Sequence, residues 1–76
     1  MKIKFSRHAK RRAKLYKISE SVILKVLEGK DLPGKGTYEI LEDVEGFKYP
    51  LKIVVVIEND LITIVTNYPL KKGRKI

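Results

Sequence analysis

The chain has 76 residues and no cysteine, so it is expected to form one domain with a thin core that no disulfide supports. Hydrophobic residues make up 43% of the composition and charged residues 34%, which is typical of a globular domain and excludes a disordered tail. The formal net charge of +8 indicates an anionic partner, and no apolar run approaches the ~20 residues needed to span a bilayer.

The N-terminal residues predict a short strand followed by a basic helix. Residues 2–5 alternate Lys-Ile-Lys-Phe, which is typical of an edge strand with Ile3 and Phe5 turned inward. Ser6 is the expected N-cap of a helix from about residue 7 to residue 16. Because the first residues lack the apolar run of a signal peptide, we expect a soluble, cytoplasmic protein.

The two predicted helices differ in the face that each offers to a sheet. In the first helix, Ala9 and Ala13 share one face, and their small side chains would let the helix lie close to a sheet. The second helix is expected to begin after the N-cap Ser19 and to end with Gly29 as its C′ residue. Its apolar stripe comprises Val22, Ile23, Val26 and Leu27.

The second half of the chain predicts three strands. Residues 37–42 alternate, residues 51–57 form an apolar run typical of a central strand covered on much of both faces, and residues 61–66 pair back after a tight turn. The element order is therefore β-α-α-β-β-β. We expect a single α+β domain over residues 1–76, with an antiparallel sheet of three to four strands packed on two N-terminal helices and a basic tail over residues 70–76.

Basic and acidic residues are segregated along the chain. Residues 1–17 carry eight basic side chains and no acid, residues 71–76 carry four more, and the nine acids lie between against five lysines. Such segregation favours nucleic acid as the partner, then an acidic protein and, a distant third, an anionic membrane, while two solvated ends without a ligand remain the alternative. The candidate RNA contacts are Arg7, Lys10, Arg11, Lys14, Lys71, Lys72, Arg74 and Lys75.

His8 and Arg12 are the candidate catalytic pair. Histidine can exchange a proton near neutral pH, and Arg12 lies one helical turn further on, where its guanidinium can hold phosphoryl oxygens. This combination suits metal-free cleavage of RNA by its own 2′-hydroxyl, with a second proton-transfer group supplied by Tyr68, Tyr16 or a lysine of the tail. Alternatively, His8 is a surface or capping residue and Arg12 pairs with an acid such as Glu20. No metal-binding motif and no cofactor motif are recognised.

Thr66 and Tyr68 are two further candidates, at the end of the last predicted strand. Their spacing places them on one strand face, which is expected to open toward the first helix. Tyr68 could then stack on a base or donate a proton, or it could simply close the end of the core.

The motifs resemble those of a group of small prokaryotic proteins. His8-Ala9-Lys10-Arg11-Arg12 matches a His-Ala-x-x-Arg opening, Ile18-Ser19 matches the start of the next helix, and Thr66 and Tyr68 match a Thr-x-Tyr-like end of the last strand. The likeness extends from about residue 5 to residue 68. Many relatives carry Arg where this chain has Tyr16 and Gly where it has Lys17.

That group is similar to the RelE and BrnT toxins, compact α+β ribonucleases of toxin–antitoxin pairs. The resemblance implies metal-independent RNA cleavage, with His8 and Arg12 as the leading site pair, and neutralisation by a cognate antitoxin. We therefore expect a RelE-like endoribonuclease, the toxin of a type II toxin–antitoxin system. The alternatives are a non-catalytic nucleic-acid-binding module and a protein-interaction domain that docks an acidic partner.

Overall fold

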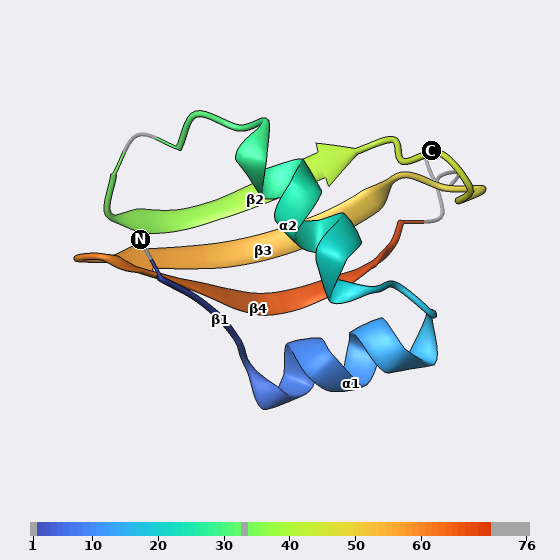
Figure 1. The fold of residues 1–76 in the computed structure, drawn as a ribbon, viewed down its shortest axis with the longest axis horizontal. Coiled ribbons are helices and arrows are strands. Elements are labelled where there is room, and N and C mark those ends of the chain that lie inside the picture. Colours follow the sequence, from blue (N-terminus) through green and yellow to red (C-terminus); the bar gives the residue numbers. More distant parts are fainter. Residues whose placement is uncertain (1, 33, 71–76) are drawn as a thin grey trace.

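The computed structural model describes residues 2–32 and 34–70 and contains two helices and a four-stranded sheet. The elements follow in the order β1 (Lys2–Phe5), α1 (Arg7–Leu15), α2 (Glu20–Glu28), β2 (Gly36–Glu42), β3 (Leu51–Glu58) and β4 (Leu61–Pro69) (Figure 1). This order confirms the predicted β-α-α-β-β-β fold. Neither helix in the described part of the chain is long and apolar enough to cross a membrane.

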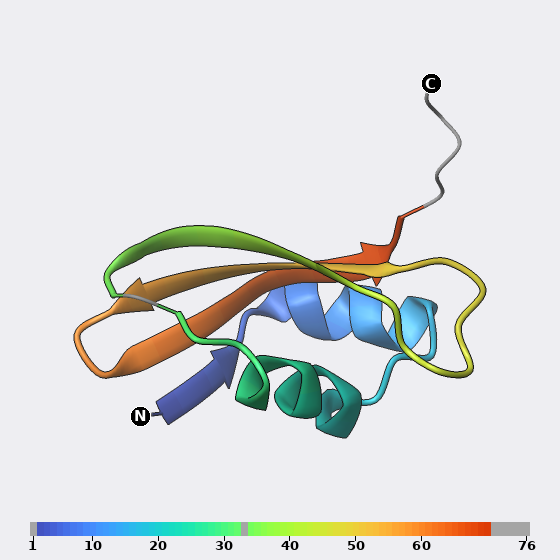
Figure 2. The ribbon, with the colours of Figure 1, turned by 90° about the horizontal axis from the view of Figure 1, so that it is seen from above.

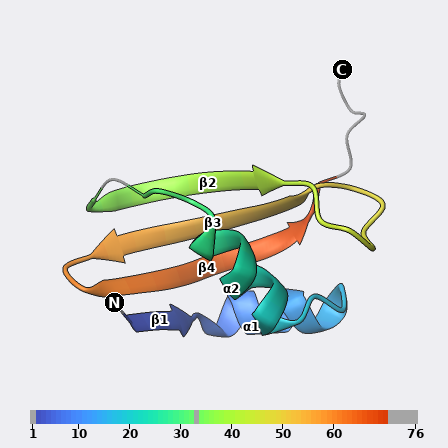
Figure 3. The ribbon, with the colours of Figure 1, turned by 45° about the horizontal axis from the view of Figure 1, so that its top comes forward.

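The strands lie side by side in the order β1-β4-β3-β2 (Figure 3). The β2–β3 and β3–β4 pairs are antiparallel, as expected, whereas β1 pairs parallel to the first half of β4. α1 continues from β1 and packs along the second half of β4 (Figure 1). Thus β4 has β1 and then α1 on one side, and the first helix is held at the edge of the sheet.

Both helices lie on the same side of the sheet, and α2 crosses that face (Figure 2). We call this the helix face; Leu51, Ile53 and Val55 of β3 are fully buried on it. We call the opposite side the open face, because no described helix lies over it (Figure 2). The expectation that β3 is covered on much of both faces is therefore only half met, since Val54 and Val56 on the open face are half-buried.

The core-facing residues of the helices agree with the sequence pattern. Ala9 and Ala13 of α1 and Ile23 and Leu27 of α2 are buried. Ile3 was expected to point into the core, but its side chain is 39% exposed. Its strand, β1, is only four residues long and lies at the edge of the sheet, so its outer end receives little cover.

The two helices end in different ways. After α1, the Ile18 amide donates to the Ala13 carbonyl (2.8 Å) and the Lys17 amide donates to the Lys14 carbonyl (3.3 Å), which is the Schellman pattern. Lys17 has φ +58° and so occupies the left-handed position that this motif normally gives to glycine. After α2, Gly29 is the C-cap with φ −84°, so the prediction that it is a C′ residue was wrong.

Candidate nucleic-acid interface

A β-bulge in β4 decides which side chains reach the open face. Val55 pairs with Ile64 while Val54 pairs with Thr66, so Val65 is an extra residue in the ladder. Simple alternation from the buried Ile64 would turn Thr66 toward the helix face. Because Val65 is an extra residue on β4, Thr66 and Tyr68 lie on the open face instead.

After the bulge, Asn67 and Tyr68 therefore point to opposite sides of the sheet. Asn67 pairs with Ile53 and is completely buried on the helix face. Tyr68 pairs with Lys52 and shares the open face with it. The expectation that Thr66 and Tyr68 share one strand face is confirmed.

Ser6 joins the start of α1 to this bulge. Its amide donates to the Ile64 carbonyl at 3.0 Å, and its hydroxyl donates to the Val65 carbonyl at 2.9 Å. The same hydroxyl oxygen accepts the Ala9 amide at 3.0 Å, which makes Ser6 the N-cap, as predicted. One serine thus satisfies the bulged carbonyl and fixes where the helix begins.

Asn67 holds the first helix against the sheet at a second point. Its Nδ2 donates to the Ala9 carbonyl at 3.2 Å in a fully buried contact. Its Oδ1 has no hydrogen-bond partner among the described residues, and neither does the buried Oγ1 of Thr66. Asn67 was not among the predicted residues, although an amide side chain in an otherwise apolar strand was the available signal.

Arg12 and Tyr68 are brought together on the open-face side of α1. The Arg12 Cζ lies 5.9 Å from the centroid of the Tyr68 ring, at the limit of a cation–π contact. Both side chains are half-buried. In the described part of the chain the ion pairs are Lys30–Glu42 (2.7 Å) and Lys52–Glu39 (3.3 Å), so no described acid neutralises the Arg12 guanidinium.

His8 lies one helical turn before Arg12, so the two side chains project to the same side of α1. The imidazole is exposed and makes no side-chain hydrogen bond or ion pair with another described residue. Tyr16, the other candidate proton donor on this helix, is the C-cap, about 12 Å further along the axis from His8. Of the two tyrosines, Tyr68 is the one whose ring lies beside the Arg12 guanidinium.

The remaining basic residues of α1 are exposed, and some of them border a hollow. Arg7, Lys10, Arg11 and Lys14 all face solvent. A hollow of about 520 Å³ at the junction of β1 and α1 is lined by Lys4, Phe5, Ser6, Arg7, Lys10 and Thr63, that is, by three cations and no acid. Lys4 was not among the predicted contacts. The predicted contacts Lys71, Lys72, Arg74 and Lys75, and the tail that they form, lie outside the described residues.

Lys52 and Leu41 are two open-face residues that the sequence analysis missed. Lys52 stands between Tyr68 and Leu41 in the strand register, and its Nζ is paired with Glu39. Leu41 is 54% exposed. A hollow of about 160 Å³ beside them is lined by Glu39, Ile40, Leu41, Lys52 and Leu70.

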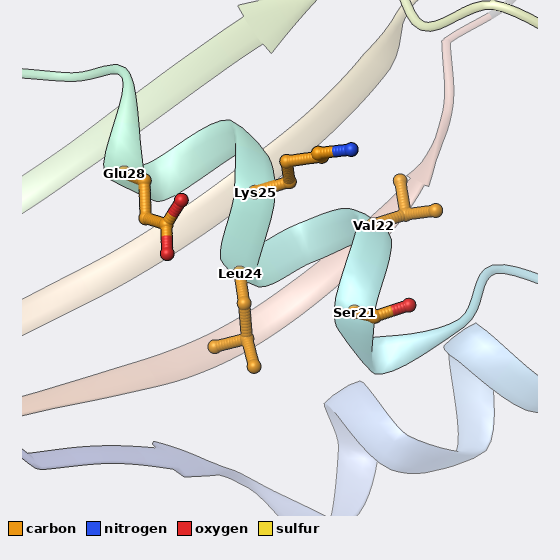
Figure 4. Close-up of a pocket in the computed structure, with 5 residues that line it drawn as sticks. All are labelled: Ser21, Val22, Leu24, Lys25 and Glu28. Carbon is orange, nitrogen blue, oxygen red and sulfur yellow. The ribbon is translucent and has the colours of Figure 1, made fainter.

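The outer surface of α2 is a weaker candidate for a binding site. A hollow of about 380 Å³ is lined by Ser21, Val22, Leu24, Lys25 and Glu28. Figure 4 shows that the Lys25 amine and the Glu28 carboxylate project in different directions from the helix, so these polar groups do not converge. Within residues 2–32 and 34–70, no three His, Asp or Glu side chains gather in a way that could hold a metal ion.

The open face and the adjoining side of α1 thus combine a guanidinium that no described acid neutralises, an aromatic ring, an imidazole one turn away and several lysines. Comparisons with models of protein families, with curated proteins and with solved structures found no match for this chain.

Proposed function

We propose that the protein is a metal-independent endoribonuclease that acts in the cytoplasm, with its site where α1 meets the open face of β4. The observation that carries this proposal is the Arg12 guanidinium, which lies over the Tyr68 ring without a described acid to neutralise it. A cation left free beside an exposed histidine is what a phosphodiester requires, because negative charge accumulates on the phosphoryl oxygens in the transition state.

The proposed reaction uses the 2′-hydroxyl of the RNA as nucleophile. His8 accepts the proton of that hydroxyl while the 2′-oxygen forms a bond to phosphorus. Arg12 binds the phosphoryl oxygens, and the bond from phosphorus to the 5′-oxygen breaks. Tyr68 donates its hydroxyl proton to the leaving 5′-oxygen and is afterwards reprotonated from solvent. The products are a 2′,3′-cyclic phosphate and a free 5′-hydroxyl.

The exposed basic side of α1 supports RNA as the substrate. Arg7, Lys10, Arg11 and Lys14 face solvent and can contact phosphates without selecting a base. The resemblance to RelE and BrnT toxins adds the proposal that the chain is the toxin of a type II pair, neutralised by an acidic antitoxin. Lys17 is a departure from that group, many of whose members have Gly at the position where this chain adopts φ +58°.

The test is cleavage of a mixed single-stranded RNA by the purified chain in EDTA. We expect cleavage that leaves 2′,3′-cyclic phosphate ends, that falls at least about a hundredfold in His8→Ala, and that is weaker in Arg12→Lys, which keeps the charge but loses the guanidinium fork. Lys25→Ala, on the exposed side of α2, is the matched control and should cleave like the wild type. Circular dichroism establishes that each variant is folded.

Cleavage that stops in EDTA, or that is unchanged in His8→Ala and Arg12→Ala, would contradict the proposed mechanism. For the toxin hypothesis, expression of the wild-type chain alone should arrest growth and expression of His8→Ala should not. Growth arrest by both the wild type and His8→Ala would mean that toxicity does not depend on the proposed chemistry.

One observation favours a second candidate function, a nucleic-acid-binding module without catalysis. No described residue orients the His8 imidazole, whereas a general base is usually held in place by a hydrogen bond. This alternative predicts salt-dependent RNA binding, no cleavage and little effect of His8→Ala. An acidic protein partner in place of RNA is distinguished by the absence of any nucleic-acid binding.

A further inference from the structure

Charge on the open face is arranged as a gradient from one edge of the sheet to the other. In the parallel register, Lys2 pairs with Leu61 and Lys4 with Thr63, so both lysines lie on the open face at the β1 edge. Arg12 continues this cationic edge along α1. The far edge, β2, contributes no cation to this face.

Between the two edges, the open face carries the apolar side chains of β3 beside Thr63 and Thr66 of β4 and Glu39 of β2. Val54 and Val56 of β3 are half-buried, and Leu41 of β2 is 54% exposed. Tyr68 adds an aromatic ring whose neighbour across the ladder is Lys52. A row across the face therefore runs Arg12, Tyr68, Lys52 and Leu41, that is, from a cation without a described acid to a ring, then to a lysine paired with Glu39, and then to an exposed apolar side chain.

Single-stranded RNA has the chemistry that matches this gradient. Its phosphates form one charged edge and its unpaired bases form a flat, largely apolar edge that can stack on exposed ring and aliphatic surfaces. A duplex hides the faces of its bases and presents phosphates on both sides, so it would match the cations alone. An acidic peptide would likewise satisfy the cations but would have no flat apolar groups for Leu41, Val54 and Val56.

We propose that the open face binds single-stranded RNA, with its phosphates along Lys2, Lys4 and Arg12 and its bases over Tyr68, Val54 and Leu41. The inference rests on the proposed function for the identity of the polymer and deepens it by naming the strand type and its orientation. The hollow beside Leu41 is bordered by the Lys52–Glu39 pair, which offers one donor and one acceptor to the edge of a base.

The experiment measures binding separately from cleavage. A labelled 2′-O-methyl oligonucleotide of about ten nucleotides, which lacks the nucleophilic hydroxyl, is titrated with the protein and compared with a hairpin duplex of the same composition. We expect the single strand to bind at least about tenfold more tightly than the duplex at one salt concentration. Lys4→Glu should weaken single-strand binding and lower its dependence on salt.

Leu41→Asp is the decisive variant, because the side chain is exposed and its replacement leaves the core intact. Ser21→Asp adds the same charge at an exposed site on α2, on the other side of the sheet, and serves as the control. Leu41→Asp should reduce single-strand affinity about tenfold more than Ser21→Asp does and should affect the duplex no more than the control does.

Three results would overturn the inference: equal binding of duplex and single strand, equal effects of the two aspartate variants, or competition by polyglutamate as effective as by RNA. A dimer that sedimentation detects in the wild type but not in Leu41→Asp would assign the face to a second copy of the chain. Tight single-strand binding without cleavage of unmodified RNA would remove the proposed enzyme and leave this inference standing.

Discussion

Replacement of Asn67 by aspartate tests how tightly α1 is docked on β4. The substitution preserves the shape of the side chain, but it replaces the Nδ2 donor to the Ala9 carbonyl by an oxygen that carries charge when the group ionises. The site is completely buried, and Oδ1 already lacks a partner among the described residues. An ionised carboxyl there would face a carbonyl oxygen with no compensating donor.

The size of the effect follows from proton linkage. The introduced carboxyl avoids ionisation in the folded state, so its pKa there rises above the unfolded value of about 3.9. Below pH 4 the protonated group can still donate to the Ala9 carbonyl, and the loss of stability is small. Above that pH, only the unfolded state ionises, and each further pH unit costs about 1.4 kcal/mol until the folded pKa is reached. At pH 7 the loss is therefore about 4 kcal/mol.

Urea unfolding followed by circular dichroism between pH 4 and pH 8 measures this loss as a difference from the wild type. A domain of 76 residues has roughly 4–11 kcal/mol of stability, so the variant should keep about 0–7 kcal/mol of it at pH 7 and nearly all of it at pH 4. Asn59→Asp, in the exposed turn between β3 and β4, is the control and should show no such pH dependence. A loss for Asn67→Asp that is constant with pH would refute the reasoning, because it would mean that water reaches this site.

Two further substitutions test how α1 is held at its ends. Ser6→Ala removes both the helix cap and the donor to the Val65 carbonyl, so it should lower the unfolding free energy by about 2 kcal/mol. Ser19→Ala removes a single cap bond that is longer and exposed, so it should cost about 1 kcal/mol. Equal losses of the two variants in urea unfolding would contradict this expectation. Lys17→Gly should raise the unfolding free energy by about 1 kcal/mol, because glycine adopts φ +58° without strain. A midpoint temperature of thermal unfolding that is unchanged or lower than that of the wild type would contradict this expectation.

Local signals in the sequence were sufficient for most of the fold. Ser6 and Ser19 marked the two helix starts, and each hydroxyl does accept an amide of the first turn. The apolar run that became β3 was correctly placed at the centre of the sheet. The parallel pairing of β1 with β4 had no local signal, because it joins residues such as Lys2 and Leu61 that are far apart in the chain.

The part of the candidate site that depends on local spacing was predicted, and the part that depends on strand pairing was not. The helical spacing of His8 and Arg12 was visible in the sequence, and the structure places Arg12 at Tyr68. Lys4, Lys52 and Leu41 were missed because a residue's place on the open face depends on its strand partners and not on its neighbours in sequence. The roles assigned to His8 and Arg12 stay predictions.

The extra residue in β4 connects the fold to the proposed function. If every residue of β4 took its regular place in the ladder, with Val65 paired and no bulge, the alternation that buries Ile62 and Ile64 would carry Tyr68 to the helix face and Asn67 to the open face. The helix would then lose its buried amide contact, and Arg12 would lose the ring that it now covers. Because the Ser6 hydroxyl binds the Val65 carbonyl and also begins α1, the bulge and the helix depend on each other. The bulge thus lets Asn67 hold the basic helix from the helix face while Tyr68 meets Arg12 from the open face, and the proposed site requires both.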